Sequence, residues 1–295
     1  MFVEAIELAA GWTRPIHTIV RYFGSDQVHP GAATLFFVND EGWALTCKHV
    51  AQAFVVGDQL HGRRSEFNAE RAKLSGNKKR QAEKALARKY GLERGKPLEL
   101  QNRVINCVDG PVNLRIEMHP TLDVALLKFS DFTALSPTTF PVFAANGAAL
   151  KQGKSLCRLG FPFPEFTNFA YNAKTDTIEW TDQGRNLSPR FPIDGMVTRH
   201  LVGPTGEAIG FELSTPGLRG QSGGPAFDTR GCVWGMQSAR NHLDLNFDVD
   251  LEVYRDGGKR HVKESAVLHV GHCVHVDVLK DFMRQHDVPF SEQES

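Results

Sequence analysis

The sequence predicts an all-β fold of two antiparallel barrels, with a helical insertion in the first barrel and a helix near the C-terminal end. Two features of the 295 residues lead to this prediction. Short apolar or alternating runs recur along the chain, and residues that favour turns separate them. A polar, Pro-containing link over residues 131–139 divides these runs into two sets. We therefore expect one barrel on each side of this link.

Strands are expected where β-branched, aromatic or alternating apolar residues form a short run. A final helix is expected over residues 278–286, because Asp277 can cap it and because Leu279, Phe282 and Met283 share one face. The first-barrel strands are expected over residues 18–23, 33–38, 43–46, 101–107, 114–117 and 124–129, and the second-barrel strands over residues 155–160, 177–181, 195–202, 209–213, 225–227, 233–238 and 266–274.

Residues 61–96 interrupt the first set with good helix formers, and Gly76 and Gly91 punctuate them, so we expect two short helices there. Twelve Lys or Arg stand against four Glu in this basic insertion. A solvated helical hairpin explains the pattern, and a docking site for a protein partner or activator is the functional alternative. Nucleic acid is disfavoured as a partner, because aromatic residues for base stacking are not interleaved with the charges.

Three segments carry residues with catalytic potential. His49 ends the apolar segment 42–50, and Asp123 precedes the apolar run 124–129. Ser222 lies in the turn GQSGGP (residues 220–225), where the neighbouring glycines expose its hydroxyl. Each of these residues has a structural explanation when taken alone, as a core histidine, a strand-end cap or a turn residue. Their order along the chain, His then Asp then Ser, is the order of one class of hydrolytic triad.

These segments resemble the trypsin-like, chymotrypsin-fold serine endopeptidases, and the bacterial HtrA-like and glutamyl-endopeptidase-like branches more than digestive trypsin. The family patterns G-x-x-L-T-x-x-H-V, D-(L/V)-A-(L/V)-L and G-x-S-G-G-P correspond to residues 42–50, 123–127 and 220–225. The resemblance implies two six-stranded barrels over residues 15–135 and 136–288, with a cleft between them. It also implies a protein or peptide substrate, and neither a cofactor nor a metal.

By this resemblance Ser222 is the nucleophile, His49 the general base and Asp123 the residue that orients and stabilises the imidazole. The backbone amides of Gly220 and Ser222 would form the oxyanion hole. Gln221 stands where zymogen-activated relatives carry an aspartate, so we expect no activation by release of a new N-terminal amine. The alternatives are a catalytically silent fold that binds peptides, and a regulated processing protease for one partner.

The resemblance also suggests a substrate pocket formed by Pro216, Gln237, Ser238, His269 and Gly271. Pro216 stands six residues before Ser222, where relatives that prefer Arg or Lys have an acidic residue, so this preference is not expected. His269 could favour acidic residues, although Gln237 stands where glutamyl endopeptidases have a histidine. The same region offers zinc ligand types in His269, His272, Cys273 and His275. Strand alternation turns His272 to the opposite face, so a metal site is not expected.

Composition excludes several classes of function. The chain has 34 basic and 34 acidic residues, so no net charge attracts it to nucleic acid or membranes. No apolar run approaches the roughly 20 residues that cross a bilayer. Acidic residues near Met1 argue against a signal peptide. The five cysteines are scattered without paired or metal-type spacing, which favours reduced thiols and a cytoplasmic location.

Overall fold

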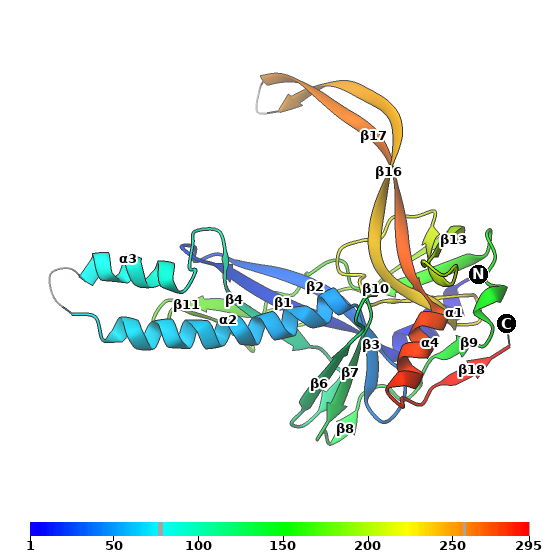
Figure 1. Ribbon diagram of the computed structural model, residues 1–295, viewed down its shortest axis with the longest axis horizontal. Helices are drawn as coiled ribbons and strands as arrows, with labels where there is room; N and C mark the ends of the chain where they lie inside the picture. Colours follow the sequence, from blue (N-terminus) through cyan, green and yellow to red (C-terminus); the bar gives the residue numbers. More distant parts are fainter. Residues whose placement is uncertain (76–78, 256–257, 295) are drawn as a thin grey trace.

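The computed structural model describes residues 1–75, 79–255 and 258–294, and it confirms the predicted all-β double barrel (Figure 1). The first barrel is a curled antiparallel sheet of six strands in the order β4-β1-β2-β3-β7-β6. Its central strands β3 and β7 are almost wholly buried, which explains their continuous apolar sequence. The strands are β1 (Thr13–Tyr22), β2 (Val28–Phe37), β3 (Trp43–Thr46), β4 (Pro97–Val104), β6 (Asn113–Met118) and β7 (Ala125–Ser130).

The second barrel is closed. Six strands pair in the order β15-β10-β13-β14-β17-β16, and β15 also pairs with β16, which completes the ring. Strands β9 and β18 extend the sheet in parallel beside β16. The bounds are β9 (Val142–Ala144), β10 (Ser155–Gly160), β13 (Phe191–Val202), β14 (Ala208–Leu213), β15 (Pro225–Phe227), β16 (Cys232–Arg255), β17 (Gly258–His275) and β18 (Ser291–Gln293).

Two small ladders and a 3-10 turn (η1, Gly147–Ala149) complete the loops. One ladder pairs β5 (Val108–Asp109) with β8 (Ala134–Leu135), and the other pairs β11 (Phe169–Asn172) with β12 (Thr177–Trp180).

A continuous apolar core runs through both barrels and holds them together. Phe36 of the first barrel lies 6.4 Å, ring to ring, from Phe143 of β9. Trp12 packs on the other side of Phe36 at 5.7 Å. Trp12 ends helix α1 (Val3–Trp12), which the sequence analysis did not anticipate and which buries Ala5 and Ala9 as well. The two barrels therefore share one core, which fixes the position of the loops at their ends.

The helices of the basic insertion differ from the prediction of two short helices within residues 61–96. Helix α2 (Lys48–Ala72) has 25 residues and begins next to His49, and α3 (Lys79–Lys89) has 11. Gly57 does not interrupt α2, because the helix packs against β4 there and a Cβ at this position would lie only 2.9 Å from the carbonyl oxygen of Leu100. Within the described residues, no helix is long and apolar enough to cross a membrane.

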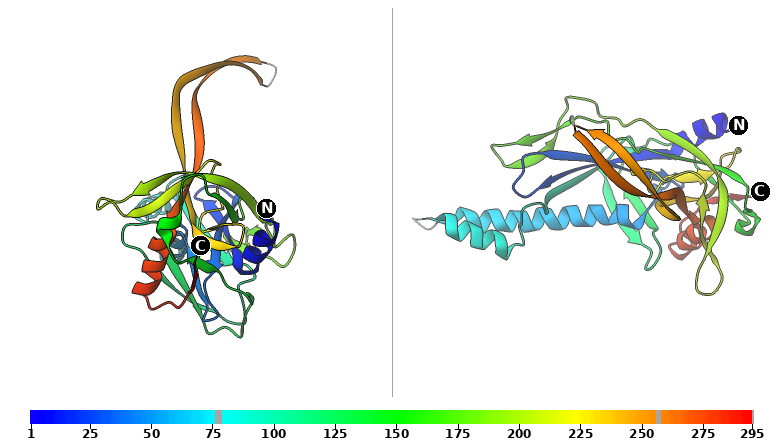
Figure 2. Two further views of the ribbon diagram at one scale, coloured as in Figure 1. Left: turned by 90° about the vertical axis from the view of Figure 1, so that its right-hand side faces the viewer. Right: turned by 90° about the horizontal axis from the view of Figure 1, so that it is seen from above.

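Three other expectations need correction. The run 177–181, expected as a strand of the second barrel, is β12, which pairs only with β11 in a separate two-stranded sheet. The runs 233–238 and 266–274 are only the barrel ends of β16 and β17, which continue as a two-stranded ribbon beyond the barrel (Figures 1 and 2). The C-terminal helix α4 (Val276–Gln285) forms as expected, with Leu279, Phe282 and Met283 buried. Its N-cap, however, is His275, whose Nδ1 accepts a hydrogen bond from the backbone amide of Asp277.

Candidate active site

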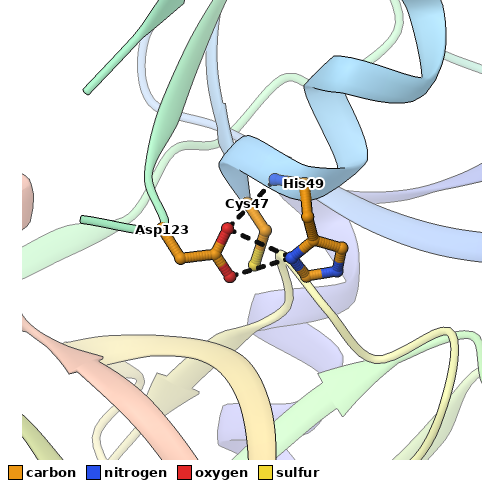
Figure 3. A group of neighbouring side chains, drawn as sticks. All are labelled: Cys47, His49 and Asp123. Carbon is orange, nitrogen blue, oxygen red and sulfur yellow. Dashed lines mark hydrogen bonds and ion pairs between the residues drawn. The ribbon is translucent and has the colours of Figure 1, made fainter. Parts of the chain in front are cut away.

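His49 and Asp123 meet at the mouth of the first barrel (Figure 3). Strand β3 ends at Thr46, and His49 lies in the first turn of α2. Asp123 lies just before β7, the strand that pairs with β3, so the ladder brings the two residues together. His49 Nδ1 lies 2.9 Å from Asp123 Oδ2 and 3.1 Å from Oδ1, and the backbone amide of His49 donates to Oδ1 at 3.0 Å.

Asp123 is held as a carboxylate by its hydrogen bonds. Burial alone would raise its pKa, but hydrogen bonds from His49 and Ser238 outweigh burial and hold the pKa of Asp123 well below its ordinary value. The shortest of these bonds is donated by Ser238 Oγ to Asp123 Oδ2, at 2.5 Å. This negative charge beside Nδ1 favours the ring tautomer that carries its proton on Nδ1, and it leaves Nε2 free to accept a proton.

Ser222 lies in a turn that only glycine-rich sequence can form. Gly220 and Gly223 have φ angles of 91° and 87°, in the left-handed region. A Cβ at Gly223 would overlap the carbonyl oxygen of Thr34, while the backbone amide of Thr34 donates to the carbonyl of Ser222 at 2.9 Å. The turn is therefore anchored to the first barrel, although its residues follow the second-barrel strands β10, β13 and β14.

Ser238 links the serine turn to the His49–Asp123 pair. Its side chain donates to Asp123, and its carbonyl oxygen accepts a hydrogen bond from Ser222 Oγ at 3.1 Å. Among the hydrogen bonds of the described residues, none joins Ser222 Oγ to His49. The backbone amides of Gly220 and Ser222 also have no acceptor among those bonds. All three residues that the sequence singled out, His49, Asp123 and Ser222, thus belong to one chain of contacts.

Cys47 lies beneath the pair and is the third member of a group whose ligand atoms are close enough for a metal (Figure 3). Burial, followed by the charge of Asp123, raises the pKa of the Cys47 thiol well above its usual value, so the sulfur is protonated in the metal-free protein. The thiol donates to the carbonyl of Gln237 at 3.2 Å. Cys47 is therefore a packed thiol that supports the Gln237 backbone.

A small pocket of about 150 Å³ opens beside Ser222. Of the residues that the sequence suggested for it, Gln237 and Ser238 line it, and Pro216 immediately precedes its wall. His269 does not line it: its Nδ1 faces that of His242 at 2.5 Å on the exposed ribbon. Gly271 lies behind the wall instead, against the guanidinium of Arg158. The remaining lining residues are 217–219, Ser222, Ala239 and Arg240.

Arg158 is the residue that the sequence analysis missed. Its side chain is fully buried, and it donates to Gln237 Oε1 at 2.6 Å and to Thr215 Oγ1 at 2.6 Å, directly behind the pocket. The signal was present in the sequence, because a charged residue stands inside the apolar run 155–160.

The suggested zinc ligands do not converge. His269 lies on the ribbon, Cys273 is buried within the barrel and His275 caps α4. Among the described residues, only the group at Cys47 brings three ligand types together.

The family model of the trypsin-like peptidase domain matches residues 33–236. Two solved structures of the HtrA-type protease AlgW, one with a tripeptide and one with a decapeptide, share 11% and 12% sequence identity with the chain, with TM-scores of 0.47 and 0.49.

Both alignments cover 97% of this chain, but only 63% and 67% of the AlgW chains. No curated protein sequence matches significantly. The family match extends over more than half of the chain and includes the His49, Asp123 and Ser222 segments. The chain therefore belongs to the trypsin-like peptidase domain family.

Proposed function

We propose that the chain is a serine endopeptidase that hydrolyses peptide bonds through a covalent Ser222 acyl-enzyme. One observation carries the proposal: Ser238 bonds both to Asp123, the partner of His49, and to Ser222, which lies in a turn whose glycines adopt positive φ angles. A partly buried, hydrogen-bonded carboxylate, an imidazole with one free nitrogen and an accessible hydroxyl are the groups that this chemistry needs.

The reaction begins with a side-chain rotation of Ser222. In the free protein its hydroxyl donates to the carbonyl of Ser238, and a change of χ1 would redirect it to His49 Nε2. Catalytic hydrogen bonds are often loose before substrate binds. As Ser222 Oγ bonds to the substrate carbonyl carbon, its proton passes to His49 Nε2 and then to the departing amine. Water subsequently attacks the acyl-enzyme, and His49 accepts a proton from that water and returns it to Ser222 Oγ as the Oγ–acyl bond breaks.

The backbone amides of Gly220 and Ser222 are proposed to stabilise the oxyanion. Neither donates to an acceptor among the hydrogen bonds of the described residues, so both are available to a developing negative charge. Losing one such donor typically costs about 10²–10³ in rate.

A catalytically silent peptide-binding domain is the second candidate, and the Ser222–Ser238 hydrogen bond favours it, since it engages the Ser222 hydroxyl with a backbone carbonyl. A fluorophosphonate probe separates the two. We expect the wild-type chain to be labelled, the Ser222→Ala variant to be unlabelled, and an Asp123→Asn variant to be labelled at least ~10³-fold more slowly. Labelling that persists in Ser222→Ala, or that is absent from the folded wild-type chain, would favour the binding domain.

We also propose that the basic hairpin of α2 and α3 recruits a protein partner or activator. The two helices are joined by ion pairs between Lys89 and Glu70 and between Arg71 and Glu83. Between them lies a pocket with an apolar floor that includes Phe67 and Leu92. A cytoplasmic location is proposed because all five cysteines are free and buried.

A further inference from the structure

Arg158 is a charged side chain in the interior of the second barrel. It belongs to β10, and its residue is 0% exposed. Its guanidinium donates four hydrogen bonds, all to neutral acceptors. These acceptors are Gln237 Oε1 at 2.6 Å, Thr215 Oγ1 at 2.6 Å, and the carbonyl oxygens of Thr215 at 3.1 Å and Pro216 at 3.2 Å.

No carboxylate pairs with this guanidinium among the ion pairs of the described residues. A buried charge without a counter-ion is costly, and burial accordingly lowers the pKa of Arg158. Arginine nevertheless keeps its proton in proteins. The charge of Asp194 on the neighbouring strand β13 acts on Arg158 from a distance, but no carboxylate among the described residues contacts the guanidinium.

This charge lies behind the pocket next to Ser222. Gln237 lines the pocket and accepts directly from Arg158, while Thr215 and Pro216 lead into the wall residue Gly217. Gly271, at the other side of the guanidinium, must be glycine, because a Cβ there would overlap Arg158 Nη1. The missing side chain at position 271 is what allows Arg158 to reach the pocket base.

Gln237 lies between Arg158 and the pocket, and the hydrogen bond from Arg158 sets the orientation of its amide group. Its Oε1 faces the guanidinium, so its amide nitrogen points the other way, next to Gly217 in the pocket wall. Nε2 donates one hydrogen bond, to the carbonyl of Ala239 at 2.5 Å. A primary amide has two N–H donors, and the second has no acceptor among the hydrogen bonds of the described residues, although Gln237 is only 1% exposed.

The rim of the pocket beside Ser222 is positively charged, like Arg158 behind it. Arg219 and Arg240 both line it, and neither appears in an ion pair among the described residues. Within the part of the chain that the structure describes, its lining contains no Asp or Glu. A basic substrate side chain would therefore be repelled by three positive charges, whereas the single negative charge of an acidic one would be attracted to them.

We propose that this pocket selects an acidic side chain, Asp or Glu, at the residue whose carbonyl group Ser222 attacks. The inference rests on the proposed function for its role in cleavage, but the binding preference can be measured without catalysis. Arg158 and Gln237 would determine specificity, with Gln237 donating to the carboxylate and Arg158 supplying the charge behind it.

The experiment measures binding of labelled hexapeptides to the Ser222→Ala variant by fluorescence anisotropy. The peptides share five residues and a free terminal carboxylate, and they end in Glu, Asp, Leu, Ala or Lys. We expect the Glu and Asp peptides to bind at least tenfold tighter than the Leu peptide, which corresponds to ~1.4 kcal/mol. Equal binding, or tighter binding of Leu or Lys, would overturn the inference.

A second variant tests the origin of the preference. Gln237→Glu places a carboxylate within reach of Arg158, so it forms an ion pair in the interior and should remain folded. We expect the acidic preference to disappear in this variant. Gln152→Glu is the matched control: it is the same substitution at an exposed position, and the preference should persist. A preference that survives Gln237→Glu unchanged would show that Arg158 does not create it.

Fluorophosphonate labelling of the wild-type chain separates this inference from the proposed function. Labelling combined with a preference for Leu would support the protease and refute the acidic specificity. An acidic preference without labelling would support the pocket assignment and refute catalysis.

Discussion

Acidification is expected to destabilise the protein through His17, which lies in β1 and has no exposed surface. Its ring stacks on Phe166 with centroids 3.9 Å apart, and its Nε2 lies 2.9 Å from Ser188 Oγ. Nδ1 has no hydrogen-bond partner in the described structure. Burial, assisted by the charge of Arg103, lowers the pKa of His17 from 6.5 to about 4.

The direction in which stability changes with pH follows from the protons that His17 binds in the folded and unfolded states. Between pH 6.5 and 4 the unfolded chain binds a proton at His17 that the folded chain does not, so stability falls as the pH falls through this window. Above pH 6.5 His17 is neutral in both states, so its full contribution to the stability of the fold is present. Evaluating the two titrations at pH 5 gives a loss of about 2 kcal/mol relative to pH 7, and the loss approaches roughly 3 kcal/mol below pH 4.

Urea unfolding at pH 7, 6 and 5 measures this loss. The matched variant is His17→Gln, whose amide can still bond to Ser188 but does not titrate. Other histidines and carboxylates contribute equally to both proteins, so the difference between their pH slopes isolates His17. We expect the wild-type chain to lose about 2 kcal/mol more than the variant between pH 7 and 5. Equal losses would refute the argument that His17 is buried in its neutral form.

Two further predictions concern the support of the site. Ser238→Ala removes the 2.5 Å hydrogen bond to Asp123, so the pKa of that carboxyl should rise and fluorophosphonate labelling should slow about tenfold. Ser238→Thr, which keeps the hydroxyl, should restore the rate, and full activity in the alanine variant would count against this role. Gly223→Ala should destabilise the fold by over ~2 kcal/mol, because its Cβ overlaps Thr34. Gly153→Ala, at a similar φ of 89° but in open space, should cost only about half as much in urea unfolding.

The residues of the candidate site could be identified from local sequence because each lies where a strand meets a turn. Strand β3 has the bounds predicted for it, and His49 follows its end after two residues. Asp123 and Ser222 are likewise set by the apolar run or the glycines next to them. Whether these three residues act together is a matter of long-range contacts, and the hydrogen bonds through Ser238 join segments 115 and 16 residues apart.

Two elements were harder to foresee, for different physical reasons. The ribbon of β16 and β17 does alternate apolar and polar residues, but a two-stranded ribbon projecting from a barrel lacks the third strand or packed helix that usually stabilises such a pair. Helix α1 was missed because it is short, and its stability comes from burying Trp12 in the barrel core.

By itself, the order of residues determined that this chain forms strands in two groups and carries His, Asp and Ser in the order of a protease triad. These features depend on alternation, turns and spacing between near neighbours in the chain. Only the tertiary structure decided which residues surround the pocket proposed to bind the substrate. It turned His269 away on the ribbon and brought Arg158 against Gln237, 79 residues later in the chain. The local sequence could not specify that contact, because it requires the second barrel to close.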